Sequence, residues 1–477
     1  MSTLATPPPA PVRVDPAAVR ELAASFGGTL VEPGVDGAYD GARRIWNASI
    51  DKRPALIAYC TGVADVIAVL RCARETGLPL AVRSGGHSFP GQSLVDGGIV
   101  LDLSRTKGVR VDPDARVARV QAGVLLGELD RETQQFGLAV PAGIVTHTGV
   151  AGLTLGGGIG WLSRRYGLTV DQLLSVDLVT ADGTFVTADE KREPELFWAM
   201  RGAGANFGVV TEFTFRLNPV GPIVLAGPIL WPMEESPQVM RFYREWITDL
   251  PDSLSTIVVH RKAPPLPAIP EELHGRPVLA VIACCTGSVE AGEELLRPLR
   301  NFRVPPLLDL CVAKPFVQHQ AMFDPSFPHG WRYYFRSCDV DRLTDEVIDT
   351  TAEHSLRIAS PVSTVGIFHL GGAVARTGED DTPYTGRTIG HTFNINGNSV
   401  TTEGFAEERN WCRELWSALR PHHAGVYVNF LMDEGGDRVK EAYGERKLGR
   451  LRAVKRQYDP DNAFRSNQNI APEPSTR

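Results

Sequence analysis

The sequence predicts an α+β protein with two large domains. Strand-like and helix-like segments are mixed along the 477 residues, but they do not alternate regularly as they would in a doubly wound parallel fold. A chain of this length is too long for one ordinary hydrophobic core. The pattern changes near residues 219–222, after which the strands and helices become longer, so we expect a domain boundary there.

In the first part, residues with known positional preferences mark several element boundaries. Asp15 and Pro16 are typical of a helix start, and Gly27 follows as its end. A second helix begins after Thr61 and ends at Gly77. The further predictions are strands at residues 78–83, 99–103, 138–141, 175–180, 184–187 and 209–217, hairpin turns at 112–114 and 182–183, and helices at 126–136 and 195–201.

Beyond the boundary, long strands and helices predict an antiparallel sheet backed by helices. These elements are expected at residues 223–230, 237–250, 255–260, 278–285, 289–302, 332–337, 341–354 and 364–375, of which 332–337 and 364–375 are predicted strands. Residues 264–270 and 378–386 are expected to be surface loops.

Composition and charge exclude several classes of function. A hydrophobic content of 43% and a charged content of 22% are normal for a soluble globular protein. The net charge of −7 gives no reason to expect nucleic acid or a membrane as a partner. The seven cysteines lack a CxxC spacing, so we expect buried thiols and no metal site. Residues 1–12 resemble a tail and not a signal peptide, and no apolar run could span a membrane, which predicts a cytoplasmic protein.

Two glycine-rich clusters carry the functional signal. They are Arg83-Ser-Gly-Gly-His-Ser88 and Gly152-Leu-Thr-Leu-Gly-Gly-Gly-Ile-Gly160, and each follows a strand-like run. Glycine lets consecutive backbone N–H groups approach a phosphate, and such nests bind anions without a lysine. His87 places a nucleophile beside this anion site, which indicates a flavin dinucleotide with a covalent attachment point. A nicotinamide-binding Rossmann site is not expected, because no cluster has the complete G-x-G-x-x-G spacing.

At these motifs the chain resembles the vanillyl-alcohol-oxidase superfamily, and within it the berberine-bridge-enzyme-like branch. The first cluster is similar to the flavin-linking loop, and residues 143–168 are similar to the second flavin loop of that branch. Residues 201–212 resemble the segment that the family places against adenine, and residues 458–470 resemble its C-terminal signature. The four blocks follow the order of the family. The resemblance implies the two-domain VAO/PCMH-type flavoprotein fold, with FAD as cofactor.

The resemblance also implies how the chain is divided. An FAD-binding domain is expected over residues 1–222, with its core at about 50–219, and a substrate-binding domain over 223–425. Residues 426–477 return to the FAD domain. The implied cofactor-binding residues are Arg83, Ser84, Gly85, Gly86, His87, Ser88, Val145, Thr146, Thr148, Gly149, Gly152, Gly156, Gly157, Gly158, Gly160, Asn206, Gly208, Val209, Val210, Asn429 and Asn467.

The resemblance implies one covalent link, from His87 to the 8α-methyl carbon of the flavin. Members with two links carry a cysteine two residues after the first glycine of the second loop. That position is Val145, so no cysteinyl link is expected. In this respect the chain is similar to hydroxynicotine oxidases, which favours a small substrate.

The catalytic base cannot be transferred from the family. Phe430 stands where many relatives have a tyrosine base, and Gly371 stands where others have a glutamate. His369 is a candidate, because residues 364–375 resemble the strand beneath the substrate, and an interior histidine bonded to the backbone is an equal alternative. The further candidates are Tyr427, Tyr334, His147 and Arg336.

The implied activity is that of an FAD-dependent oxidase. Hydride would pass from a C–OH or C–N carbon of a small organic substrate to the flavin, and dioxygen would be reduced to hydrogen peroxide. A dehydrogenase with another acceptor is an alternative, and Thr148 is the position that bears on oxygen access. A second alternative is a binding protein that retains the flavin but has reduced catalysis. The substrate and the oligomeric state stay open.

Overall fold

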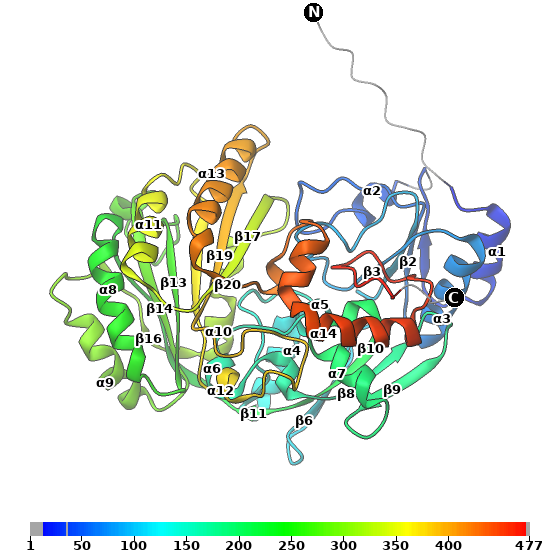
Figure 1. The fold of residues 1–477 in the computed structure, drawn as a ribbon, viewed down its shortest axis with the longest axis horizontal. Helices are drawn as coiled ribbons and strands as arrows, with labels where there is room; N and C mark the ends of the chain where they lie inside the picture. Colours follow the sequence, from blue (N-terminus) through cyan, green and yellow to red (C-terminus); the bar gives the residue numbers. More distant parts are fainter. Residues whose placement is uncertain (1–12, 35–36, 474–477) are drawn as a thin grey trace, which may run out of the picture.

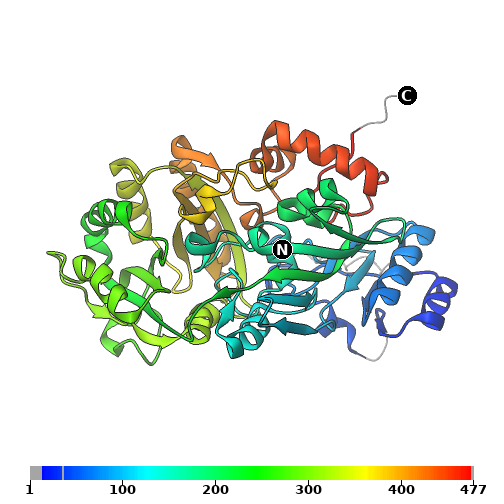
Figure 2. The same ribbon diagram turned by 90° about the horizontal axis from the view of Figure 1, so that it is seen from below.

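The computed structural model describes residues 13–34 and 37–473 and has the two-part α+β architecture that the sequence predicts (Figure 1). One part contains both ends of the described chain. The other consists of a large sheet with helices packed on its outer face. The C-terminal helix lies with the first part in both views, although the preceding chain passes through the second part (Figure 1 and Figure 2). The predicted tail at residues 1–12 lies outside the described residues.

The first part contains two main sheets. A four-stranded sheet has the order β1-β2-β4-β3, with β4 parallel to both β2 and β3, and a five-stranded antiparallel sheet has the order β5-β6-β10-β8-β9. A short pair joins β7 to β11. The strands are β1 (Thr29–Val31), β2 (Leu56–Tyr59), β3 (Leu80–Arg83), β4 (Ile99–Asp102), β5 (Val109–Asp112), β6 (Val117–Gln121), β7 (Leu138–Ala139), β8 (Leu173–Val179), β9 (Phe185–Asp189), β10 (Val209–Arg216) and β11 (Asn218–Pro219).

The four helices that the sequence predicts in the first part begin and end close to the predicted positions. The Asp15 carboxylate accepts a hydrogen bond of 2.9 Å from the Ala17 N–H and caps α1. The predicted helix at 126–136 is an α-helix that finishes as a 3₁₀ turn. The helices are α1 (Pro16–Ser25), α2 (Tyr39–Ala42), α3 (Val63–Thr76), α4 (Leu126–Thr133), α5 (Val150–Leu155), α6 (Ser163–Tyr166) and α7 (Pro194–Ala203).

The second part is built on one nine-stranded sheet. Its order is β15-β12-β14-β13-β18-β19-β17-β20, and β16 also pairs with β12. The strands are β12 (Ile223–Pro232), β13 (Leu254–Lys262), β14 (Pro277–Cys285), β15 (Leu308–Asp309), β16 (Val312–Pro315), β17 (Arg332–Val340), β18 (Thr364–His369), β19 (His391–Ser399) and β20 (His423–Gly425). All of the pairings within this sheet are antiparallel, as the sequence predicts.

The four long helices of this part cover one face of the sheet. Apolar side chains of α8, α9, α11 and α13 form a core with that face. Figure 1 shows these helices beside the sheet. The opposite face packs partly against Trp161 and Leu162 of the first part. The helices are α8 (Ser236–Trp246), α9 (Val289–Arg300), α10 (Phe316–Gln320), α11 (Asp345–Leu356), α12 (Ala373–Arg376) and α13 (Phe405–Ala418). The uncovered face is therefore the one that meets the first part.

Two predicted elements have different bounds in the structure. The element predicted at 341–354 begins at Asp345, because the Thr344 hydroxyl accepts a 3.2 Å hydrogen bond from the Val347 N–H and caps the helix. The strand predicted at 364–375 ends at His369. Gly371 and Gly372 have φ values of +91° and +56°, so the chain turns there before α12. Gly371 therefore does not share a strand face with His369.

Other elements have no counterpart in the prediction. They include β2, β19, α13, the long C-terminal α14 (Gly436–Tyr458), and the short helices α2, α5, α6, α10 and α12. Asparagine is depleted in strands, and β19 carries it at three alternate positions. Glycine weakens helices, and α14 contains Gly444, where the backbone is not helical, and Gly449. Local propensity therefore masked both elements.

Several smaller predictions can be compared directly. All seven cysteines are buried and free. Residues 264–270 form an irregular loop, as predicted, but the loop at 378–386 is only partly exposed, because Thr382 and Tyr384 are buried. Among the described residues, no helix combines the length and the apolar character that crossing a bilayer requires.

A buried ion pair lies at the end of the C-terminal helix, and its lysine also contacts the first part. The Lys455 ammonium lies 2.6 Å from the Asp459 carboxylate, and both side chains are fully buried. Lys455 also donates to the carbonyls of Asn206 and Phe464 at 2.8 and 2.9 Å. The Asp459 carboxylate accepts the N–H groups of Ala463 and Phe464. Asp459 thus stabilises the turn that follows the helix.

We expect Lys455→Met to lower the free energy of unfolding by about 3–5 kcal/mol, because it leaves the Asp459 carboxylate buried without a counter-charge. Lys440→Met is the matched control on the same helix, since Lys440 is exposed and pairs only with exposed Glu445. Urea-induced unfolding of both variants measures the difference. Equal midpoints for the two variants would contradict this role of Lys455.

Candidate functional site

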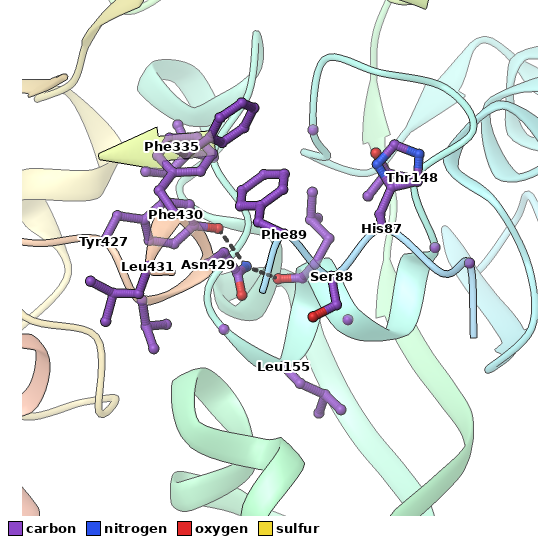
Figure 3. A pocket seen from close by; sticks show the side chains of 18 of the residues that line it. His87, Ser88, Phe89, Thr148, Leu155, Phe335, Tyr427, Asn429, Phe430 and Leu431 are labelled. Atoms are coloured by element: carbon purple, nitrogen blue, oxygen red, sulfur yellow. Dashed lines mark hydrogen bonds between the residues drawn. The ribbon is translucent and has the colours of Figure 1, made fainter. Parts of the chain in front are cut away.

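A cavity of about 340 Å³ lies where the first part, the uncovered sheet face and the C-terminal segment meet (Figure 3). Its walls come from the loops after β3 and β7, the sheet strands β13 and β17–β19, and residues 427–431. The predicted cofactor-binding residues that line it are Ser84, Gly85, Gly86, His87, Ser88, Val145, Thr148, Gly149, Gly152, Gly156, Asn206, Asn429 and Asn467. The cavity therefore brings together residues from three distant parts of the sequence.

The two glycine-containing loops touch through their backbones. A Cβ atom on Gly85 would lie 2.4 Å from the Gly149 nitrogen, and one on Gly149 would lie 2.6 Å from the Gly85 nitrogen. Within the described part of the chain, the backbone N–H groups of Gly85, Gly86, His87 and Ser88 donate no hydrogen bond. Consecutive free N–H groups beside a cavity form an anion-binding nest. This donor set fits the pyrophosphate of a dinucleotide such as FAD.

His87 is held on two sides. Its Nε2 lies 2.6 Å from Nδ1 of His147, and its ring stacks on Trp46 with centroids 4.6 Å apart. The Trp46 indole N–H donates to the Phe327 carbonyl at 2.7 Å, which fixes the tryptophan in turn. Burial, followed by the nearby His147 and His329, lowers the pKa of His87 well below its ordinary 6.5. The imidazole is therefore neutral at pH 7, as a nitrogen nucleophile must be.

His87, His147 and His329 form a group of three imidazoles. One nitrogen of each lies within 4.8 Å of the others, a grouping that the sequence analysis did not foresee. Two nitrogens bound to one tetrahedral zinc ion would be about 3.3 Å apart, since each bond is about 2.0–2.1 Å long. The 2.6 Å between His87 and His147 is shorter and corresponds to a hydrogen bond.

The sheet side of the cavity is aromatic and uncharged. Among the described lining residues there is no aspartate, glutamate, lysine or arginine. The carbonyl oxygens of the Asn394 and Asn396 side chains are buried without a partner, while the Asn396 Nδ2 donates to Thr364 Oγ1 at 2.7 Å. The aromatic residues on the walls are Trp46, Phe89, Phe323, Phe327, Phe335, Phe368, Tyr427, Phe430 and Tyr443.

The sequence analysis missed the two asparagines, although a signal was present. In residues 393–396, apolar and amide side chains alternate, and a period of two is typical of a strand with two different faces. Phe393 and Ile395 lie in the helix-covered core, so Asn394 and Asn396 face the cavity.

Two of the predicted catalytic residues do not line the cavity. Phe368 lines it, and successive side chains of β18 point to opposite faces, so His369 points away and its Nε2 accepts a 3.0 Å hydrogen bond from Arg164. Phe335 likewise lines the cavity, whereas the Tyr334 hydroxyl accepts hydrogen bonds from Arg336 and Arg413 under the helices. The prediction that His369 and Tyr334 act in the cavity is therefore corrected, because successive side chains of their strands point to opposite faces of the sheet.

Tyr427 lines the cavity but its hydroxyl is already occupied. It accepts hydrogen bonds from the Gly158 N–H at 2.9 Å and from Asn429 Nδ2 at 2.8 Å. Asn429 also donates to the Leu153 carbonyl at 2.9 Å, and Figure 3 shows these contacts of Asn429 as dashed lines. Burial raises the pKa of Tyr427 to about 12. Tyr427 is thus a neutral link between the glycine loop and the C-terminal segment.

The remaining predicted cofactor residues are not part of the cavity lining. Arg83 pairs with Asp102 and donates to the Ala42 carbonyl at 2.7 Å. The Thr146 N–H donates to Asp324 at 2.8 Å. The others are Gly157, Gly158 and Gly160 in the second loop, and Gly208, Val209 and Val210 at the start of β10. None of these residues lines the cavity.

Comparison with known proteins is consistent with this geometry. Residues 54–189 match the FAD binding domain family, and residues 426–471 match the family described as berberine and berberine like. An FAD-linked oxidoreductase of Dictyostelium discoideum is 32% identical, over 95% of this chain and 97% of its own. The (R)-6-hydroxynicotine oxidase of Paenarthrobacter nicotinovorans is also 32% identical, over 94% and 98%. The crystal structure of 6-hydroxy-D-nicotine oxidase from Arthrobacter nicotinovorans has a TM-score of 0.84 at 30% identity and covers 94% of this chain and 99% of its own.

We expect Tyr427→Phe to lower the free energy of unfolding by about 1–3 kcal/mol, because the Gly158 N–H loses its acceptor and Asn429 keeps only its hydrogen bond to the Leu153 carbonyl. Tyr384→Phe is the matched control, since the Tyr384 hydroxyl is buried without a partner and its loss should not destabilise the protein. Thermal unfolding of both variants tests this. If Tyr427→Phe kept full stability but no longer reduced bound flavin, Tyr427 would be a base and not a link.

Proposed function

The chain belongs to the berberine-bridge-enzyme-like FAD-linked oxidoreductases of the vanillyl-alcohol-oxidase family, and on this premise we propose that it is an oxidase whose FAD is bonded to His87 alone. When bound, FAD supplies an acceptor for hydride from a C–OH or C–N carbon of a small organic substrate and passes the electrons to dioxygen, which gives hydrogen peroxide. The hydroxynicotine oxidase relative supports an oxidase, and Val145 supports a single link.

The proposal is carried by one observation, the placement of a neutral imidazole beside free N–H donors. The N–H groups of residues 85–88 can hold a pyrophosphate, and the His87 ring lines the same cavity. A neutral ring nitrogen can form a bond to carbon, whereas an imidazolium cannot.

Acid precipitation of the purified protein tests the link. We expect a yellow pellet, and intact-mass spectrometry should show the polypeptide plus one FAD. His87→Ala should release all of its FAD on acid treatment, because the proposal contains no covalent bond to FAD other than the one at His87. Wild-type protein with only the apoprotein mass would contradict the covalent attachment. An oxygen electrode then separates an oxidase from a dehydrogenase, because only the former consumes dioxygen with substrate alone.

We infer further that the substrate is oxidised at a C–N carbon and binds uncharged. A charged group would lose its hydration in this cavity without a partner among the described lining residues. Oxidation of an alcohol needs a base for the O–H proton. A neutral amine loses hydride without that base, because its nitrogen lone pair stabilises the resulting cation. The unpartnered oxygens of Asn394 and Asn396 are suited to accept a donor on the substrate.

The absence of a carboxylate or lysine base on the described walls also favours the alternative of a flavin-retaining binding protein. Anaerobic loss of the yellow colour with any amine excludes that alternative.

With a cyclic amine as substrate, we expect the rate of anaerobic flavin reduction to rise with pH and to level off at the pKa of the amine itself. Only the neutral amine can lose hydride, and no lining carboxylate or lysine titrates in this range. Stopped-flow absorbance with two amines of different pKa measures it. A profile with the same midpoint for both amines would point to a base on the protein and contradict this mechanism.

A further inference from the structure

The hydrogen bond between His87 and His147 joins two loops that are far apart in the sequence. His87 follows β3, and His147 lies in the loop between β7 and α5. The two rings have centroids 4.7 Å apart and are tilted by 44°, so the 2.6 Å contact between Nε2 and Nδ1 is made near the ring edges. One of these nitrogens must carry the shared proton.

The other nitrogen of His87 is free. Within the described part of the chain, no hydrogen bond involves its Nδ1, and the ring lines the cavity. Trp46 covers one face of the ring and limits its rotation. His87 is therefore held through Nε2 and presents Nδ1, which can act as a nucleophile only if the ring proton is on Nε2.

The surroundings keep both histidines neutral. Burial is the main cause that lowers the pKa of His147, as it is for His87, while Asp324 raises it and His329 lowers it further. The charged or titratable groups that face the pair are thus Asp324 and His329. A neutral His147 protonated on Nε2 has a free lone pair on Nδ1, which accepts the proton of His87 and fixes the tautomer with a free Nδ1.

We propose that His147 positions His87 for flavin attachment and accepts its proton, an inference that rests on the proposed link at His87. A bond forms between His87 Nδ1 and the 8α carbon, and one C–H bond of that methyl group breaks. The Nε2 proton of His87 passes to His147 Nδ1. Dioxygen takes the released electron pair, through the ring system, together with two protons as hydrogen peroxide. In total, one imidazole, one flavin methyl group and one dioxygen give one linked flavin and one hydrogen peroxide.

His329 does not have this role. Its ring is perpendicular to that of His87 at 5.7 Å and lies 5.1 Å from that of His147, with no hydrogen bond to either. It is exposed, whereas His87 and His147 are partly buried. His329→Ala is therefore the matched control, because it removes an imidazole from the same group without removing the contact.

The test follows covalent incorporation and not turnover. Full-length wild-type protein, His147→Ala, His147→Asn and His329→Ala are supplied with FAD, and the fraction of bound FAD that survives acid denaturation is measured over time by intact mass. Bound FAD is measured separately after gel filtration, so that a folding or binding defect is recognised. The rate of attachment is compared at equal bound FAD.

We expect His147→Ala to attach FAD about 10²–10⁴-fold more slowly than His329→Ala, since a positioned proton acceptor contributes about that factor. His147→Asn should be intermediate, because its amide oxygen can fix the tautomer of His87 but cannot take up the proton. If His147→Ala binds no FAD, the comparison of His147→Asn with His329→Ala decides. Attachment in the His147 variants as fast as in His329→Ala would overturn the inference. Wild-type protein without covalent FAD would instead overturn the proposed link itself.

Discussion

The backbone contact between Gly85 and Gly149 determines the geometry of the cavity. No side chain fits between the two loops, since a Cβ on either glycine would lie within 2.6 Å of the other backbone. The contact places the loop after β3 beside the loop after β7, and His87 therefore meets His147. Within the described part of the chain, the N–H groups of residues 85–88 beside this contact donate no hydrogen bond. One close approach thus supports both the anion nest and the histidine pair.

The sequence predicted the parts of this arrangement that local signals encode. The cap at Asp15 and the glycine clusters are examples, because each depends on residues near one another in the chain. It could not predict which face of a buried strand would meet the cavity. Both faces of β18 are buried, so its sequence does not distinguish His369 from Phe368. The orientation is decided by helices packed on the other side of the sheet.

The sequence predicted only in part how the C-terminal segment closes the cavity. The motif around Asp459 indicated, through resemblance, that the C-terminal segment returns to the first part. The partner of Asp459, Lys455, was not predicted, because a lysine on a helix is normally exposed and only the tertiary structure buries it. Tyr427 shows the same limit, since its hydroxyl meets the Gly158 N–H across 269 positions in the chain.

The scarcity of charged groups around the cavity has two consequences. Burial disfavours the protonated form of an imidazole, so His87 stays neutral and keeps a lone pair for bond formation. The same surroundings disfavour any charged ligand, since the described walls offer aromatic rings and amides but no counter-charge. A carboxylate placed on the walls to serve as a base would stabilise the imidazolium of His87 and weaken it as a nucleophile. An uncharged wall is therefore compatible with flavin attachment, and the proton chemistry of the substrate must then depend on the substrate itself.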